Sequence, residues 1–137
     1  MALLRWLLVC STILLSCICK RALLEQRIPG GRMNASMENP DVRKALQFAM
    51  NKYNRASNDM YGSRVSEVVR VQTQVVEGLK YYFTVKVGRT VCRKGVAVLE
   101  TCAFHEGPNP AKTVTCSFEV HSVPWRSHIS LLQSVCT

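Results

Sequence analysis

The chain has 137 residues, of which 47% are hydrophobic and 20% are charged. This length fits one domain around a single core and excludes a two-domain enzyme with a cleft between its lobes, and the composition excludes a disordered chain. The 18 Lys and Arg residues against 9 Asp and Glu residues give a net charge of +9, which favours contact with acidic surfaces but identifies no partner.

Residues 1–19 have the pattern of a secretory signal peptide. Arg5 is their only charged side chain, and an apolar run at residues 6–18 follows it and ends before Lys20. This run is shorter than the about 20 residues that a membrane-spanning helix needs, so we expect no membrane anchor. We predict that the signal is removed and that the protein is secreted and extracellular. The mature chain then keeps a net charge of +8, because 17 basic residues remain against 9 acidic ones.

Loss of residues 1–19 removes three of the seven cysteines and leaves an even number. In the oxidising secretory pathway an even number predicts two disulfides. Among the three possible pairings the sequential one closes the shortest loops, so we predict that Cys92 pairs with Cys102 and Cys116 with Cys136. The alternative is a zinc site, but the mature chain has no C-x-x-C and its histidines do not fall at zinc-finger spacing. We therefore expect neither a metal site nor a cofactor.

Residues 20–38 are polar, lack periodicity and contain the pair Gly30 and Gly31, which predicts a flexible N-terminal arm. Within this arm, Asn34-Ala35-Ser36 is the only N-glycosylation sequon of the chain, so Asn34 is a candidate for glycosylation. We assign residues 39–137 to the folded domain.

A helix is predicted from residue 40. Asn39 can cap it, Pro40 suits its first turn, and Asp41 places a negative charge beside its positive end. The apolar residues that follow recur at helical spacing: Val42, Ala45, Leu46, Ala49, Tyr53 and Ala56. They predict an amphipathic helix of about 17 residues that ends near residues 57–59. Its other face is basic, which we interpret as a solvated surface rather than a binding face for membranes or nucleic acid.

From Val65 the period of the pattern changes to two, as in a half-buried strand. The residues expected on the buried side of this strand are Val69, Val71, Thr73 and Val75. A second alternating run has Leu79, Tyr81, Phe83, Val85 and Val87 on its buried side. Because Glu77 and Gly78 separate the two runs, they predict a hairpin with its turn at these residues.

A third alternating run has Val114, Cys116, Phe118 and Val120 on one side, and strand-like residues resume at 127–136. Residues 122–126, which include Pro124, lie between them and are predicted to form the tip of a second hairpin. One helix followed by strands predicts an α+β fold in which a four- to five-stranded antiparallel sheet wraps around one long α-helix.

The sequence contains none of the common catalytic motifs that we looked for. The chain has no G-x-S-x-G, H-E-x-x-H or P-loop motif, and its mature cysteines are expected to be bonded, so we predict that the protein is not an enzyme. Apolar residues occur instead at three expected turns, which suggests contact with a partner. Trp125 is the only tryptophan after the signal, and tryptophan is enriched at binding hot spots. Packing of Trp125 into the core is the open alternative.

These turns, in this order and with this cysteine spacing, resemble the type 2 cystatins, which are secreted inhibitors of papain-like cysteine proteases (the cathepsin class). The Q-x-V-x-G motif at residues 74–78 and Pro124-Trp125 carry the resemblance, together with residues 45–49, 53–59 and 88–90. They place it near the branch of cystatin C and egg-white cystatin.

The resemblance implies a three-part wedge that fills the protease cleft reversibly and without a covalent bond. Its expected protease-binding residues are Ile28, Pro29, Gly30, Gln74, Val75, Val76, Glu77, Gly78, Pro124 and Trp125. Relatives commonly have Val or Leu where this chain has Pro29, which lacks a backbone donor, so Pro29 is a departure that affects the arm.

The resemblance also implies inhibition of legumain-type proteases through Asn58, which matches a Ser-Asn-Asp turn after the helix. Without the family, Asn58 is simply a cap or turn residue. A monomer is expected, with domain swapping into a dimer as the alternative. A rival function is a basic host-defence or surface-binding protein on the cathelin-like version of this scaffold, but the two hairpin tips favour protease inhibition.

Overall fold

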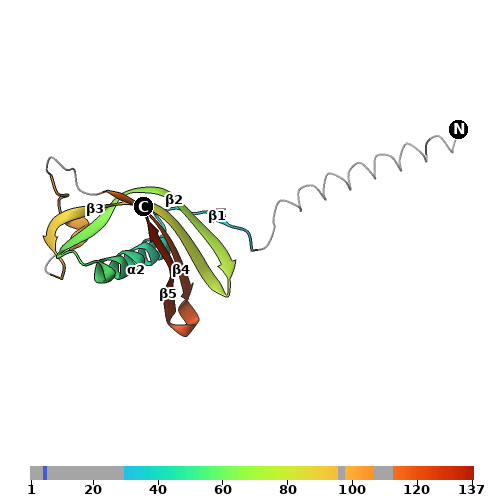
Figure 1. The fold of residues 1–137 in the computed structure, drawn as a ribbon. Helices are drawn as coiled ribbons and strands as arrows, with labels where there is room; N and C mark the ends of the chain where they lie inside the picture. The colour runs from blue at the N-terminus through green and yellow to red at the C-terminus, as the bar shows by residue number, and fades with distance from the viewer. Residues whose placement is uncertain (1–4, 6–29, 96–97, 107–112) are drawn as a thin grey trace. The chain divides into compact units, whose positions relative to one another are not determined.

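The computed structural model describes residue 5 and residues 30–95, 98–106 and 113–137 (Figure 1). Residues 1–4 and 6–29 lie outside the described residues, and these include Ile28, Pro29 and nearly all of the predicted signal. The chain divides into two units, Met1–Gly31 and Arg32–Thr137, and the second unit contains the sheet and its helix. In the described part of the chain, no helix has the length and apolar character needed to cross a membrane.

The Arg32–Thr137 unit is one helix against a five-stranded antiparallel sheet, so the predicted fold class is confirmed (Figure 1). The strands follow the chain order β1-β2-β3-β4-β5 across the sheet. Their bounds, with the helix, are β1 Met33–Asn34, α2 Pro40–Ala56, β2 Tyr61–Val76, β3 Gly78–Arg93, β4 Val114–Val123 and β5 His128–Cys136. Two short 3-10 helices, η1 Leu99–Thr101 and η2 Pro124–Arg126, lie in the connections.

Helix α2 has the predicted ends. Its N-cap Asn39 accepts a hydrogen bond from the backbone N–H of Asp41 at 2.9 Å, and Pro40 occupies the first turn. At the other end the N–H of Ser57 donates to the Tyr53 carbonyl at 3.1 Å. The predicted 17-residue amphipathic helix is therefore confirmed.

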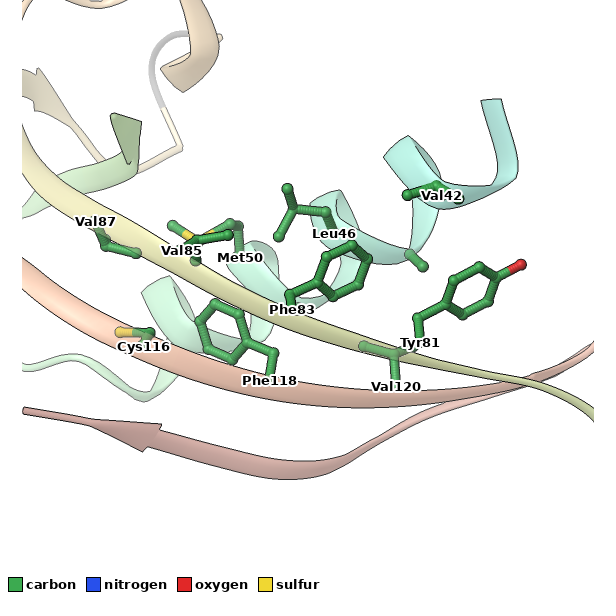
Figure 2. Packing of buried hydrophobic residues seen from close by; sticks show 12 residues of the cluster. Val42, Leu46, Met50, Tyr81, Phe83, Val85, Val87, Cys116, Phe118 and Val120 are labelled. Carbon is green, nitrogen blue, oxygen red and sulfur yellow. The ribbon is translucent and has the colours of Figure 1, made fainter. Parts of the chain in front are cut away.

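The core lies between α2 and the concave face of the sheet (Figure 2). Strand β3 supplies the central row of side chains, and β4 supplies the next row, each from alternate positions as predicted. The buried members are Tyr81, Phe83, Val85 and Val87 from β3, and Cys116, Phe118 and Val120 from β4. They meet Val42, Ala45, Leu46, Ala49 and Met50 of the helix.

Strand β2 departs from the predicted alternation. It pairs with β3 through register shifts, and Ser66 and Val69 are the extra residues at two of them. Because of these bulges Val65, Val68 and Val71 are the residues that pack toward the core, and Val69, which was predicted on the buried side, is 52% exposed.

Val75 was also predicted on the buried side, and it is 58% exposed. Val75 pairs with Leu79 and lies four residues after Val71, which pairs with Phe83 and packs toward the core. At Val75, however, the hairpin projects beyond the end of α2 (Figure 1). No helix therefore covers Val75, and alternation alone does not bury a strand residue.

Three element boundaries differ from the sequence pattern. Strand β1, which pairs Met33 with Thr73 and Asn34 with Gln72, lies inside the segment predicted as an arm without regular structure. Strand β2 begins at Tyr61 and not at Val65, and β3 continues to Arg93. A two-residue strand is too short to show a period, and the added ends of β2 and β3 contain Gly62 and Gly88 and show no regular alternation of apolar and polar residues.

The disulfides have the predicted pairing, Cys92 with Cys102 and Cys116 with Cys136. The second joins directly paired residues of β4 and β5, whose Cα atoms are 4.1 Å apart. The first ties the end of β3 to the turn after η1, where the Cys102 carbonyl also accepts a hydrogen bond from Arg64 Nε at 2.7 Å.

Asn54 fastens the helix to the sheet. Its side-chain amide donates to the Ser63 carbonyl at 3.0 Å and its oxygen accepts from the Ser63 N–H at 2.8 Å, so both backbone groups of one β2 residue are satisfied. Asn54 is buried although it is polar, which is the expected condition for a fully paired amide.

We predict that Asn54→Ala lowers the free energy of unfolding by about 2–3 kcal/mol, because two backbone groups near the core lose their partners. Urea denaturation measures this change. The control is Asn51→Ala, one turn earlier on the exposed face of the same helix, which should change stability by less than about 0.5 kcal/mol. Equal effects of the two substitutions would contradict the anchoring role of Asn54.

Candidate functional site

The first hairpin tip joins β2 to β3 at Glu77 and Gly78. Gly78 has a φ of +77°, which is the left-handed region that favours glycine. A Cβ at this position would overlap the carbonyl oxygen of Ser122 in β4. Glycine is therefore required at position 78 for two reasons: the backbone is in the left-handed region, and β4 approaches too closely to leave room for a side chain.

The second tip joins β4 to β5. Val123 is buried at the end of β4, and Pro124 then opens the short helix η2, which ends at Ser127 in the left-handed region with a φ of 48°. Trp125 is 69% exposed at this tip. The alternative in which Trp125 packs into the core is therefore wrong.

The two tips lie against each other. Arg126 Nη2 is 2.6 Å from Glu77 Oε1, and His121 Nε2 donates to the Glu77 carbonyl at 2.6 Å. The rings of His121 and His128 also meet edge to face, with centroids 6.0 Å apart. One residue of the first tip thus contacts both the strand and the turn of the second hairpin.

Three apolar side chains are exposed at these adjoining tips, namely Val75, Val76 and Trp125. Seven of the ten proposed contact residues lie on these two adjoining tips: Gln74, Val75, Val76, Glu77 and Gly78 on the first, and Pro124 and Trp125 on the second. Grouped exposed apolar side chains are typical of an interaction surface.

The base of the arm also reaches the first hairpin. The Arg32 guanidinium carbon lies 3.7 Å from the centre of the Tyr82 ring, and the Tyr82 hydroxyl donates to Gln74 Oε1 at 2.7 Å. Gly30 belongs to the Met1–Gly31 unit and has a φ of +91°, a conformation that other residues adopt at a cost. Ile28 and Pro29, the other two proposed arm contacts, lie outside the described residues.

Asn58 lies on a braced turn between α2 and β2. The Ser57 hydroxyl accepts from the Asp59 N–H at 3.2 Å, Lys94 Nζ donates to the Ser57 carbonyl at 2.6 Å, and Arg89 Nε lies 2.7 Å from Asp59 Oδ2. Asn58 itself is exposed between these two anchored neighbours. The turn therefore presents the Asn58 side chain to solvent on a fixed backbone.

The charge of Asp59 is stabilised in this turn. Burial raises its pKa, but the Tyr61 N–H, the Arg89 guanidinium and the Lys94 ammonium lower it by more, so the pKa of Asp59 lies below its ordinary value. The brace is consequently present at neutral pH and is lost only when acid protonates Asp59 at a pH below that ordinary value.

The two sites lie at opposite ends of the sheet. Tyr61, just after the Asn58 turn, begins β2, and Val76 ends it at the hairpin tip. At the usual rise of a strand, with three register shifts, this is roughly 45 Å along β2. Figure 1 shows the β2–β3 tip and the opposite ends of these strands at different edges of the domain.

A cavity of about 510 Å³ lies elsewhere, between α2, the start of β2 and η1. Leu46, Met50, Asn54 and Val65 are among the residues around it, and none of the proposed contact residues that the structure describes is. Among the described residues, no group of three or more His, Cys, Asp or Glu side chains could hold a metal ion. Asn34 of the sequon is exposed on β1.

Sequence reasoning missed the contacts that organise both sites. Arg126 is 49 positions from Glu77 (126 − 77), and Arg89 is 30 positions from Asp59. No local pattern connects such residues. Opposite charges at two expected turns were the one available signal for the pair of Glu77 and Arg126.

Comparison with known proteins places this geometry in one family. Residues 30–125 match the family model described as a cystatin domain. The chain is 66% identical to Cystatin-2 of Crotalus adamanteus over the full length of both, and 46% identical to Cystatin-C of Homo sapiens over 80% of this chain and 75% of that protein.

Solved structures agree with the sequence matches. The crystal structure of dimeric human cystatin F aligns with a TM-score of 0.71 and 32% identity, over 81% of this chain and 89% of that one. Cystatins are protease inhibitors and not enzymes, as the absence of catalytic motifs led us to expect. From the domain match, the relatives and the sheet around one helix, we conclude that the chain belongs to the cystatin family, near the cystatin C branch of type 2 cystatins.

Proposed function

We propose that this protein is a secreted, reversible inhibitor of papain-like cysteine proteases, which it blocks with the arm and the two hairpin tips. The observation that carries the proposal is the single exposed edge made by Val75, Val76 and Trp125, held by contacts between the tips. An edge of this kind fits a cleft, and its apolar side chains gain free energy when the protease walls cover them.

Inhibition by this edge needs no chemical step. The four cysteines of the mature chain are in disulfides, so none is free as a nucleophile. We propose that the tips exclude substrate by occupying the cleft, without offering a peptide bond to the catalytic cysteine. This accounts for an inhibitor that is not consumed, and it distinguishes the protein from a basic host-defence protein, which needs no such edge.

A second inhibitory site is proposed at Asn58, directed at legumain-type asparaginyl proteases. Its support is the exposed carboxamide on a braced turn, which offers a donor and an acceptor to a pocket specific for asparagine. Because this turn and the tips lie at opposite ends of β2, the two inhibitory activities should be separable. We also propose Asn34, exposed on β1, as a site of N-glycosylation.

We predict that Trp125→Ala weakens binding to papain by about 2–4 kcal/mol, because an exposed tryptophan in a proposed contact surface is a typical hot spot. Inhibition constants measured by titration against papain test the size of the loss, and circular dichroism checks the fold. Since the Trp125 side chain is exposed to solvent in the free protein and is not part of the core, the variant should fold normally.

The matched control for Trp125→Ala is Leu132→Ala. Leu132 is also half-exposed and apolar, but it lies in the middle of the edge strand β5, away from the tips. It should leave papain inhibition within about twofold of the original protein. A folded original protein without inhibition at micromolar concentration would refute the proposed function.

We predict that Asn58→Lys abolishes legumain inhibition and leaves papain inhibition intact. A specificity pocket built to pair a neutral carboxamide keeps unmatched polar groups when that side chain is replaced, which costs affinity steeply. Asn51→Lys makes the same change at another exposed asparagine and should affect neither activity. In the reciprocal experiment Trp125→Ala should leave legumain inhibition standing, and loss of both activities in either variant would contradict two separate sites.

A further inference from the structure

The ion pair of Glu77 with Arg126 joins the two hairpin tips, although such an exposed pair adds little to the stability of the fold. Both side chains are more than half exposed, and an exposed ion pair contributes little to stability because water screens it. The same Glu77 also accepts a hydrogen bond from His121 through its carbonyl. Both its backbone and its side chain are thus directed toward the second hairpin.

Each member of the pair is the chain neighbour of an exposed apolar residue. Glu77 directly follows Val76, and Arg126 directly follows Trp125. Since the two charged groups are 2.6 Å apart and belong to the two tips, we expect a protein surface that covers both tips to lie close to the pair. Water that screens the charges in the free protein is then displaced.

We infer that Glu77 and Arg126 are positioning residues, which hold the two hairpin tips at one spacing and enter the protease cleft together as a neutral pair. This inference rests on the proposed function. In a covered site the attraction between opposite charges is stronger than in water, whereas a single charge left without its partner is unfavourable. Loss of one partner should therefore harm inhibition more than loss of both.

A double-mutant cycle against papain tests this order of effects. Glu77→Gln and Arg126→Gln should each weaken inhibition at least about tenfold. The protein with both substitutions should inhibit better than either single variant, because no unpaired charge remains, but less well than the original, because the ion pair between the tips is lost. Exchange of the charges, Glu77→Arg with Arg126→Glu, should likewise inhibit better than either of its single substitutions. Additive losses, or four proteins with equal inhibition constants, would overturn the inference.

The ion pair of Glu67 with Lys86 provides the matched control. It joins β2 to β3 at 3.3 Å, both side chains are about half exposed, and it lies away from the tips. Glu67→Gln and Lys86→Gln repeat the same changes in net charge and should alter inhibition by less than about twofold. A control cycle as large as the test cycle would attribute the effect to net charge and overturn the inference.

Hydrogen exchange in the free protein measures the positioning without any protease. The amides of residues 78–80 and 125–127 should exchange faster in Glu77→Gln and Arg126→Gln, and at the original rate in Glu67→Gln. Unchanged exchange at the tips would show that the pair does not hold them. If the original protein fails to inhibit papain, the proposed function falls, and this measurement still decides whether the pair joins the tips.

Discussion

The bend of the sheet at β2 is the constraint on which the rest of the structure depends. Strand β3 alternates from Leu79 to Val87, but its partner β2 contains the extra residues Ser66 and Val69. Residues 63–76 of β2 therefore pair with a shorter stretch of β3, residues 78–89. Bulges of this kind bend a strand and increase its twist. The curved sheet covers the apolar side of α2, and the β2–β3 hairpin continues beyond the helix, where its apolar tip stays exposed (Figure 1).

Much of this fold could be predicted from the sequence because its main signals are local. Helix α2 carries its cap, its proline and its period within 18 residues, and β3 shows its buried side directly. The bulges could not be predicted from the sequence, since one extra residue moves every following side chain of the strand to the other face without altering the composition. Val69 was therefore assigned to the wrong face, and the two residues of β1 showed no pattern at all.

The candidate site could be predicted only in part, for the same reason. The residues at each tip came from a motif and a resemblance, but whether Trp125 pointed inward or outward depended on where β4 ends, which alternation does not specify. The contacts between the tips join residues far apart in the chain. Their geometry depends on the close approach of Gly78 to β4, which is a property of the folded sheet.

The hydrogen bond from His121 to the Glu77 carbonyl makes one hairpin depend on a side chain of the other. A carbonyl oxygen can only accept, so the imidazole must carry a hydrogen on Nε2. The bond therefore selects the ring form with that hydrogen and orients the ring toward the first tip. A change of side chain at position 121 consequently acts on the turn of the other hairpin, although 44 positions separate His121 from Glu77 in the chain.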